Sequence, residues 1–425
     1  MRILWLKTEL LHPVDKGGKI RTYQMLKELK REHHVTYLTL DDGAGARDAQ
    51  ERATEYCQEL VRVPHSTSGK FSAAFYRELA LNAFSRLPYA VKKYESAAMR
   101  REIRERALSG SFDLLVCDFL APSVNVPQEI ACPTVLFEHN VEELIWKRHY
   151  EVQSNPLKRA YLYGQWRKMR AFERAACRRF DQVIAVSRED SQMIAREYGV
   201  SSVKDVPTGV DTEYFRPLKG ENEELAGERH NLIFTGSMDW LPNEDAIKYF
   251  IAEIMPLVKQ SVPDVTLTVV GRNPSPHLID LSKRDTSITV TGRVEDVRPY
   301  IDSAAAYIVP IRIGGGTRLK IYEAMAMEKA IVSTTVGAEG LPVRDQQELL
   351  LADTPAAFAE ATARLLLYKD FARELGLRAA AAVRERFSWR KVAEEFAQIC
   401  QSAIKLGSAG RSVMTGMSRD ADLIA

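Results

Sequence analysis

Short apolar runs alternate with long amphipathic stretches along most of the chain, and this alternation limits the possible fold more than any other feature. The runs predict buried strands, and the stretches predict helices that cover a parallel sheet. The first half contains the candidate strands Ile3–Lys7, Val35–Leu40, Leu114–Phe119, Thr134–Glu138 and Gln182–Ser187. The second half contains Asn231–Gly236, Val265–Gly271, Ile288–Gly292, Ala306–Ile311, Ala330–Thr334 and Leu349–Ala352. The pattern predicts an α/β protein with two sheets of about five strands each.

The chain length of 425 residues exceeds what one compact core accommodates, and it predicts two domains of roughly 200 residues each. We expect the break at Val206–Pro217, which carries two prolines and a glycine, and at the polar segment 221–230 that follows. The N-terminal domain is therefore predicted over residues 1–206 and the C-terminal domain over residues 207–385. The segment 408–425 is rich in Gly, Ser and Asp and is predicted to be a disordered tail.

Composition excludes several classes of protein. A hydrophobic content of 45% with 27% charged residues is ordinary for a soluble globular protein, and a net charge of +2 argues against a nucleic-acid partner. The five cysteines form no Cys-x-x-Cys pair, so we expect reduced thiols, a cytoplasmic location and no metal cluster. The first residues are too soon interrupted by charge for a signal peptide, and no apolar run reaches the ~18 residues that span a bilayer.

A glycine-rich segment precedes a predicted helix in the C-terminal half. Gly314, Gly315 and Gly316 allow a ligand to approach the backbone closely, and Thr317 then opens a helix whose N–H groups suit a diphosphate. Lys320 and Glu323 lie three residues apart on one helical face, so the cation can meet phosphate while the carboxylate accepts from ribose hydroxyls. The alternative is a glycine-rich loop before a core helix, with these two residues as a surface ion pair.

Further glycine turns follow other predicted strands. Ligands of open parallel sheets bind beyond the carboxyl ends of the strands, so two facing domains would form a cleft lined by both sets of loops. The segments at these positions are Lys16–Arg21 and Glu138–Asn140 in the first half, and Gly236–Asn243, Gly271–Arg272 and Gly292–Arg293 in the second.

Four of these segments together resemble the GT-B glycosyltransferases, and among them the retaining family 4 group close to bacterial polysaccharide sugar transferases. They are Phe234–Ala246, Gly314–Ala326, Pro207–Phe215 and Phe387–Trp389, and the likeness covers roughly residues 1–400. The resemblance implies two Rossmann-like domains facing across a cleft. It also implies a nucleotide-sugar donor held mainly by the second domain, and a crossing helix over residues 386–407 that returns to the first.

The resemblance also implies site residues. The catalytic candidates are His139, Arg318 and Lys320, with His139 hydrogen-bonding the donor sugar and the two cations stabilising the leaving diphosphate. Arg21 and Asn140 are expected on the acceptor side. The donor-binding candidates are Gly17, Gly18, Gly236, Ser237, Arg272, Arg293, Val294, Gly315, Gly316, Thr317, Leu319 and Glu323.

Two positions depart from the pattern of the family. Many members carry two glutamates eight positions apart; Glu323 matches the second, but Gly315 stands where the first would be. Backbone N–H groups of residues 315–317 would then meet the donor sugar. The segment Gly236–Asn243 also lacks the Arg and Lys that many relatives place there, so Arg318 and Lys320 are expected to supply that charge.

The segment Trp146–Arg179 combines many cations with aromatic residues. This composition suits the headgroup region of an anionic leaflet, where each cation contributes about 1 kcal/mol. The alternative is a plain solvated helix face. An anionic membrane surface is therefore one expected partner, with contact from the inner side of the membrane.

The function expected from these observations is transfer of a sugar from a nucleoside diphosphate sugar to a hydroxyl of a polysaccharide, lipid-linked or small-molecule acceptor. No cofactor and no metal are expected, because the donor is a co-substrate and cations of the protein would replace Mg²⁺. A nucleotide-sugar epimerase of the same fold and a non-catalytic nucleotide-sugar-binding module remain alternatives. A nicotinamide dehydrogenase is disfavoured because Lys16–Arg21 is not Gly-x-Gly-x-x-Gly.

Overall fold

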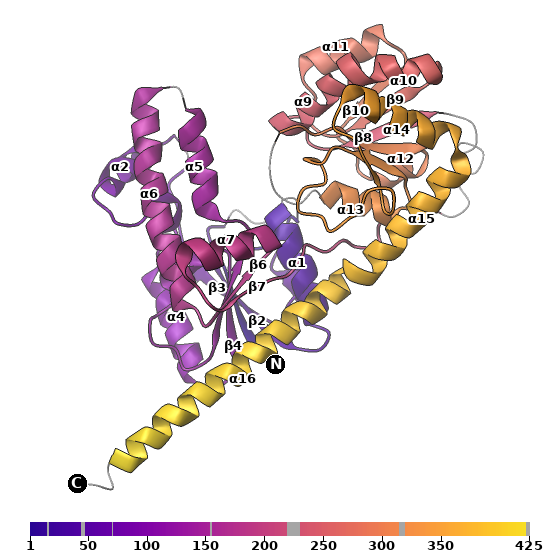
Figure 1. Ribbon diagram of the computed structural model, residues 1–425. Coiled ribbons are helices and arrows are strands. Elements are labelled where there is room, and N and C mark those ends of the chain that lie inside the picture. Colours follow the sequence, from indigo (N-terminus) through magenta and orange to yellow (C-terminus); the bar gives the residue numbers. More distant parts are fainter. Residues whose placement is uncertain are drawn as a thin grey trace. The chain divides into compact units, whose positions relative to one another are not determined.

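The chain folds into two compact units, seen in the computed structural model of Figure 1. The structure describes residues 1–14, 17–43, 47–69, 71–153, 155–218, 230–313 and 319–421. The first unit comprises Met1–Pro207 together with Val392–Ala425, and the second comprises Thr208–Lys391. The sequence analysis expects the first break after residue 206 and a crossing helix from residue 386.

The first unit is built on a seven-stranded parallel sheet with the strand order β3-β2-β1-β4-β5-β6-β7. The order reverses between β1 and β4, because the chain moves outward from β1 to β3 and then returns to the other side of β1. The strands are β1 (Arg2–Lys7), β2 (His34–Asp41), β3 (Glu59–Pro64), β4 (Leu114–Asp118), β5 (Thr134–Glu138), β6 (Gln182–Ala185) and β7 (Val203–Asp205).

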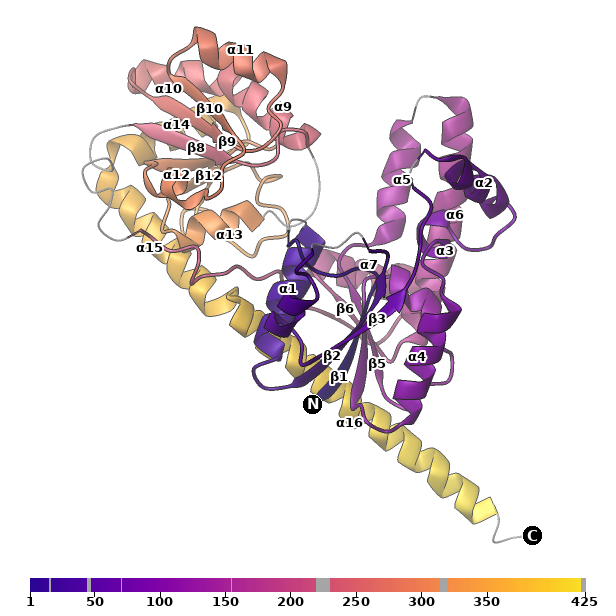
Figure 2. The same ribbon diagram turned by 180° about the vertical axis from the view of Figure 1, so that it is seen from behind.

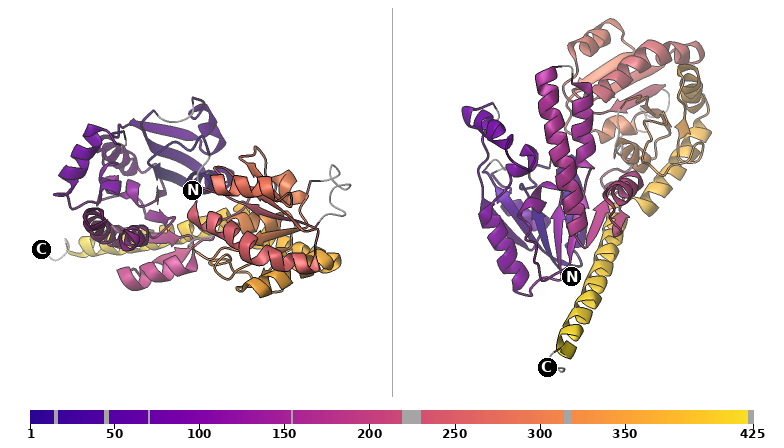
Figure 3. Two further views of the ribbon diagram at one scale, coloured as in Figure 1. Left: turned by 90° about the horizontal axis from the view of Figure 1, so that it is seen from above. Right: turned by 60° about the vertical axis from the view of Figure 1, so that its left-hand side comes forward.

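Helices cover both faces of this sheet. Figure 2 shows α1 and α4 on opposite sides of it, and Figure 3 (right) shows α5 and α6 as a hairpin of two long helices. The side chains of Leu4 and Leu6 on β1 pack with Met99 and Ile103 of α4, while Trp5 faces the other way. The helices are α1 (Gly17–Leu29), α2 (Ala73–Asn82), α3 (Tyr89–Lys92), α4 (Ala97–Leu108), α5 (Glu142–Val152), α6 (Pro156–Arg179) and α7 (Arg188–Tyr198). Two 3₁₀ turns, η1 (Glu51–Glu55) and η2 (Ala121–Asn125), complete the unit.

The second unit has a six-stranded parallel sheet with the order β10-β9-β8-β11-β12-β13, reversing between β8 and β11. Its strands are β8 (Asn231–Thr235), β9 (Thr266–Val270), β10 (Ile288–Gly292), β11 (Ala306–Val309), β12 (Ile331–Ser333) and β13 (Leu350–Leu351). Its helices are α9 (Leu241–Tyr249), α10 (Met255–Ser261), α11 (Pro276–Arg284), α12 (Arg298–Asp302), α13 (Leu319–Ala326), α14 (Pro355–Leu367) and α15 (Lys369–Arg386), with a π-helical turn η3 (Phe250–Ile254) joining α9 to α10.

The last helix, α16 (Trp389–Ala421), begins beside a bridge between Val210 and Ser388 and then joins the first unit from Val392 onward. Phe396 packs against Trp5 and Phe137, with ring centroids 5.6 and 5.0 Å apart. This confirms the expected return of a C-terminal helix to the first domain. The helix runs to Ala421, so the structure differs from the disordered tail expected from residue 408. Residues 408–421 contain no proline, and extending an existing helix requires no new nucleus.

Two strands escaped the sequence analysis, both in the first sheet, which has seven strands where five candidates were named. The six strands of the second sheet all overlap the six candidates named for the second half, one more than the expected number of about five. β3 contains two charged residues, Glu59 and Arg62, and ends in Pro64, and β7 has only three residues. Both lie at edges of the sheet, where burial is low and the apolar signal is weak. The α/β class with two Rossmann-like domains is confirmed.

Two observations bear on the location of the protein. All five cysteines are buried and unbridged. Along the described part of the chain, no helix combines the length and the apolar character that crossing a bilayer requires.

Candidate functional site

A buried ion pair lies where the strand order of the first sheet reverses. Lys7 ends β1 and Asp118 ends the neighbouring β4, and both side chains are almost fully buried. The ammonium Nζ of Lys7 donates to Oδ2 of Asp118 over 2.9 Å. Such a reversal leaves a crevice at the carboxyl ends of the strands, and this pair therefore lies at the position where open α/β sheets bind ligands.

Asp118 collects further donors. Its Oδ2 accepts from the indole Nε1 of Trp5 at 3.0 Å and from the hydroxyl of Thr22 at 2.6 Å. Burial alone would raise the pKa of Asp118, but the positive charge of Lys7 acts in the opposite direction, and the pKa lies below its ordinary value. The carboxylate is therefore ionised and fixed by the three donors.

His139 directly follows β5 and completes this group. Its Nε2 lies 2.7 Å from Oδ1 of Asp118, and its ring is held between Phe119 and Phe137, with centroids 3.8 and 4.6 Å away. Burial lowers the pKa of His139 to about 3, although Asp118 acts in the opposite direction. The imidazole is consequently neutral near pH 7. Its Nδ1 is buried without a hydrogen-bond partner among the described residues.

Gly18 is required by the close approach of α1 to Phe119. A Cβ atom at Gly18 would lie 2.7 Å from the ring of Phe119. The backbone of Phe119 is itself in the left-handed region, with φ at 75°. Such a conformation is costly for a residue with a bulky side chain. Phe119 adopts this conformation while its ring stacks on His139. The same aromatic ring therefore contacts both the start of α1 and the histidine. Gly17, the first residue of α1, has open space around it.

The two residues expected on the acceptor side lie in the first unit. Arg21 is on α1, where burial lowers the pKa of its guanidinium to about 10 against the opposing charges of Asp118 and Asp190. Asn140 is exposed, immediately after the buried His139.

A remote carboxylate fixes the turn that follows His139. Glu173 of α6 accepts the backbone N–H groups of Glu142 and Glu143 at 2.7 and 2.9 Å, and the hydroxyl of Tyr198 donates to it at 2.8 Å. Burial raises the pKa of Glu173 despite these bonds. The N-terminal N–H groups of α5 are thus capped from another helix, which holds residues 139–142 in place.

The second unit has a different polar group where its strand order reverses. Lys320 of α13 donates to Oδ1 of Asn243 at 2.8 Å and lies 4.0 Å above the ring of Phe234. The amide of Asn243 in turn donates to the carbonyl of Ser237 at 2.8 Å. A Cβ atom at Gly236 would lie 2.8 Å from Nζ of Lys320, so glycine at the end of β8 allows the cation to reach the strand end.

Beside this group lie the side chains of the β8–α9 turn. The hydroxyl of Ser237 accepts from Nε of the exposed Arg272 at 2.8 Å and donates to Asp239. The side-chain amide of Asn273 donates to Asp239 at 2.8 Å. The structure therefore brings together Gly236, Ser237, Arg272 and Lys320, four of the residues that the sequence analysis singles out for donor binding or catalysis.

Glu323 lies one turn along α13 from Lys320. Burial raises the pKa of its carboxyl to about 7, although Lys320 acts in the opposite direction. Leu319 and Val294 are partly buried against the core of this unit, and Arg293 is exposed. Gly315, Gly316, Thr317 and Arg318 lie outside the described residues.

Sequence reasoning missed several residues of these two groups, chiefly Lys7, Asp118, Thr22 and Asn243. Lys7 and Asp118 stood among the predicted strand ends but were not interpreted as charges. A signal was present, because each is a charged residue that closes an otherwise apolar strand. Within the described residues, no group of three His, Cys, Asp or Glu side chains is placed to hold a metal ion.

Two family models match this chain. The family "Glycosyltransferase Family 4" matches residues 16–214, and "Glycosyl transferases group 1" matches residues 229–367. The first match covers most of the first unit and the first seven residues of the second, and the second match lies within the second unit.

Similar proteins were found by sequence and by structure. An uncharacterized 44.6 kDa protein in the cps region of Klebsiella pneumoniae is 20% identical, over 92% of this chain and 97% of that protein. The MMP alpha-(1->4)-mannosyltransferase of Mycolicibacterium hassiacum is 28% identical over 60% of this chain, and the match spans 62% of that enzyme. The crystal structure of Anabaena Alr3699/HepE in complex with UDP is 15% identical in sequence and has a TM-score of 0.64. The structural match covers 95% of this chain and 100% of that chain.

Proposed function

Because the chain belongs to the GT-B glycosyltransferases, we propose that it transfers a sugar from a nucleoside diphosphate sugar to a hydroxyl group of a polysaccharide or glycolipid acceptor, with retention of configuration. The relative encoded in a cps region supports the polysaccharide context, and the relative in complex with UDP supports the donor class. The observation that carries the proposal is Lys320, held against the glycine-marked end of β8 by Asn243.

The second unit is suited to a nucleoside diphosphate. Lys320 and Arg272 provide cations at the carboxyl end of the sheet, and Ser237 adds a hydroxyl. As the glycosidic bond breaks, negative charge gathers on the diphosphate, and preorganised donors stabilise that charge more in the transition state than in the ground state. The carboxylate of Glu323 is assigned to the ribose hydroxyls, with which it forms charge-assisted hydrogen bonds.

The first unit is assigned to the transferred sugar. His139 is neutral and buried and has an unpartnered Nδ1, so this atom can accept a hydrogen bond from a sugar hydroxyl. Asp118 and the two flanking aromatic rings hold the imidazole in one orientation. This role requires no proton transfer to or from the histidine.

Location is part of the same proposal. We assign the enzyme to the cytoplasm, and the five buried, unbridged thiols are compatible with a reducing compartment. No cofactor is assigned, because the donor sugar arrives already activated on its diphosphate.

The test has two stages. A thermal-shift screen of nucleoside diphosphates and their sugars identifies the donor, because a ligand at 100 times its dissociation constant stabilises the folded state by ~2.7 kcal/mol. The purified enzyme is then incubated with that donor and a saccharide acceptor, and the anomeric configuration of the product is determined by NMR. The proposal predicts a new glycosidic bond with the configuration of the donor. Isomerisation of the donor without an acceptor would instead identify an epimerase, and binding without any transfer would identify a binding module.

A further inference from the structure

Four large apolar side chains project from α2 and the residues that flank it. Phe71 is 78% exposed, Tyr76 56%, Leu81 63% and Phe84 92%. Single exposed apolar residues are common on soluble proteins, whereas several within one short segment mark a surface that meets another apolar phase.

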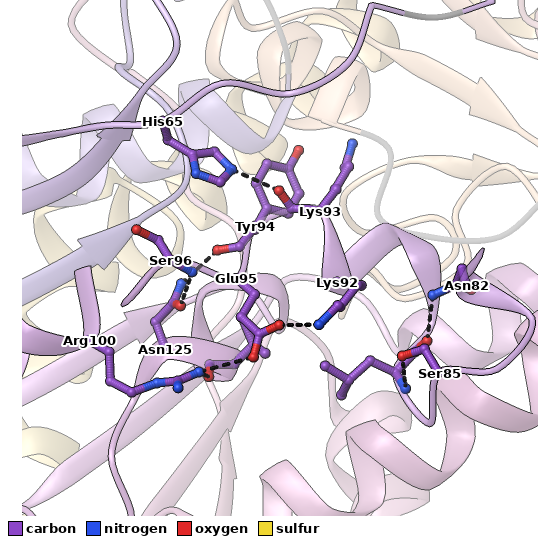
Figure 4. Close-up of polar contacts among 12 residues, drawn as sticks. His65, Asn82, Ser85, Lys92, Lys93, Tyr94, Glu95, Ser96, Arg100 and Asn125 are labelled. Atoms are coloured by element: carbon purple, nitrogen blue, oxygen red, sulfur yellow. Dashed lines mark hydrogen bonds and ion pairs between the residues drawn. The ribbon is translucent and has the colours of Figure 1, made fainter. Parts of the chain in front are cut away.

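The turn that presents Phe84 is held in place by hydrogen bonds. Figure 4 shows the side-chain amide of Asn82, which donates to the carbonyl of Leu87 at 3.0 Å, while Ser85 accepts the N–H of Leu87, also at 3.0 Å. Lys168 of α6 donates to the carbonyl of Asn82 at 2.6 Å, at the C-terminal end of α2. The exposed position of Phe84 is therefore fixed by the hydrogen bonds within the turn and by the contact of α2 with α6.

The first half of α6 continues this surface. Leu157 is 82% exposed and Tyr161 is 39% exposed. Gln165 of α6 joins the two elements, because its side chain donates to Asn82 at 2.9 Å and accepts the N–H of Tyr89 at 2.8 Å. Figures 1 and 2 both show α2 beside the part of α6 that projects beyond the sheet as a hairpin with α5.

Charge on these elements is almost entirely positive. α6 contains eight Lys and Arg residues and a single acidic residue, Glu173, which is buried. Residues 71–93 contain four Lys and Arg and one acidic residue, Glu78, whose carboxylate accepts from Ser68 and Tyr89. Arg77, Arg86 and Lys158 are exposed in the same segments as the apolar side chains.

We propose that this surface, formed by residues 71–86 and 157–170 and called here the α2–α6 face, docks the enzyme on an anionic lipid bilayer. Exposed aromatic and leucine side chains enter the boundary between headgroups and acyl chains, while the surrounding cations meet lipid phosphates. Two nearly fully exposed apolar side chains, Phe84 and Leu157, favour a bilayer over a nucleic acid, which is bound mainly through phosphate contacts. The proposal goes beyond sugar transfer and does not depend on the identity of the donor.

Vesicle sedimentation tests the proposal with the full chain. The protein should sediment with vesicles of phosphatidylcholine mixed with phosphatidylglycerol, and should remain in the supernatant with phosphatidylcholine alone. Added NaCl should release it, because salt screens the attraction between exposed charges.

Paired variants distinguish binding through the α2–α6 face from an effect of the net charge of the protein. Arg86→Glu with Lys158→Glu should weaken binding to the mixed vesicles at least about 25-fold, since each cation near the surface contributes a factor of about five. Arg101→Glu with Arg104→Glu on α4 changes the net charge equally and should leave binding within about twofold to fivefold of the wild type. For the apolar contribution, Phe84→Ser should weaken binding about tenfold, whereas Leu108→Ser, which alters an exposed leucine of α4, should not.

Circular dichroism and thermal melts of all four variants verify that each is folded. Equal loss of binding in the α4 variants, or equal sedimentation with both kinds of vesicle, would overturn the proposal. So would a protein that binds single-stranded DNA but neither kind of vesicle. Retained donor binding in the α2–α6 variants would keep this result separate from the test of sugar transfer.

Discussion

The two sheets reverse their strand order in the same way, yet the polar groups at the two reversals differ. In the first unit, Lys7 and Asp118 neutralise each other in a nearly fully buried position, and Trp5 and Thr22 also donate to Oδ2 of the carboxylate. In the second unit, Lys320 donates to a neutral amide, Asn243, beside Gly236, where a Cβ atom would meet both side chains. One group is a closed ion pair, and the other is a cation at a strand end.

The difference indicates two tasks. A closed, buried ion pair contributes little net stability, but it fixes neighbouring groups such as His139 and is costly to break. Lys320 places an ammonium group at the carboxyl end of β8, and an ammonium group can form charge-assisted hydrogen bonds to a diphosphate. We therefore interpret the first group as the support that orients His139, and the second as the group that binds the donor.

The largest effect is expected from a variant that breaks the ion pair of Lys7 and Asp118. Lys7→Met leaves Asp118 as a buried charge without its main counter-charge, and should lower the free energy of unfolding by ~3–5 kcal/mol. Chemical denaturation with urea measures this loss. The double variant Lys7→Met with Asp118→Asn should recover part of the stability, because it removes the uncompensated charge. A double variant less stable than Lys7→Met alone would show that the pair is not a closed unit.

A second variant tests what the pair supports. His139→Ala should lower kcat by a factor of about 10²–10³ with little change in donor affinity, because the histidine acts mainly as the glycosidic bond breaks. Steady-state kinetics and a thermal melt of the same preparation separate catalysis from stability. His149→Ala, at an exposed histidine of α5, provides the matched control. Near-normal turnover, or a loss of activity that only follows a loss of folded protein, would remove His139 from the site.

A smaller effect concerns Glu323. Glu323→Gln should weaken nucleotide binding above pH 7 by ~1.5–3 kcal/mol, because a ribose hydroxyl donates more strongly to a carboxylate than to an amide. The pKa of Glu323 is about 7, so the wild type must lose a proton to bind at lower pH. Its affinity should therefore rise as pH increases toward 7 and then level off.

Calorimetric titrations of wild type and Glu323→Gln across this pH range measure the effect. Titration of the nucleotide phosphate is common to both proteins, so the difference between the two profiles isolates residue 323. Identical profiles would place Glu323 outside the nucleotide site.

Much of the fold could be predicted from local sequence, because buried parallel strands are short apolar runs. The predicted strands Thr134–Glu138 and Ile288–Gly292 coincide with β5 and β10, whereas the edge strands β3 and β7 carry too little apolar signal. The glycine-rich segment pointed to Lys320 because its chemistry is local. The pairing of Lys7 with Asp118 could not be predicted in this way, because it joins residues 111 positions apart and depends on which strands are neighbours.

The central claim is that the second unit's cation, Lys320, binds the diphosphate of the donor. Isothermal titration of the nucleoside diphosphate found in the thermal-shift screen, of its monophosphate and of its nucleoside into wild type, Lys320→Met and the exposed control Lys248→Met tests it most directly. The account predicts that Lys320→Met weakens diphosphate binding at least about tenfold, equivalent to ~1.4 kcal/mol, while nucleoside binding and the control are unchanged. Equal affinities of wild type and Lys320→Met for the diphosphate, or equal losses for the diphosphate and the nucleoside, would contradict it.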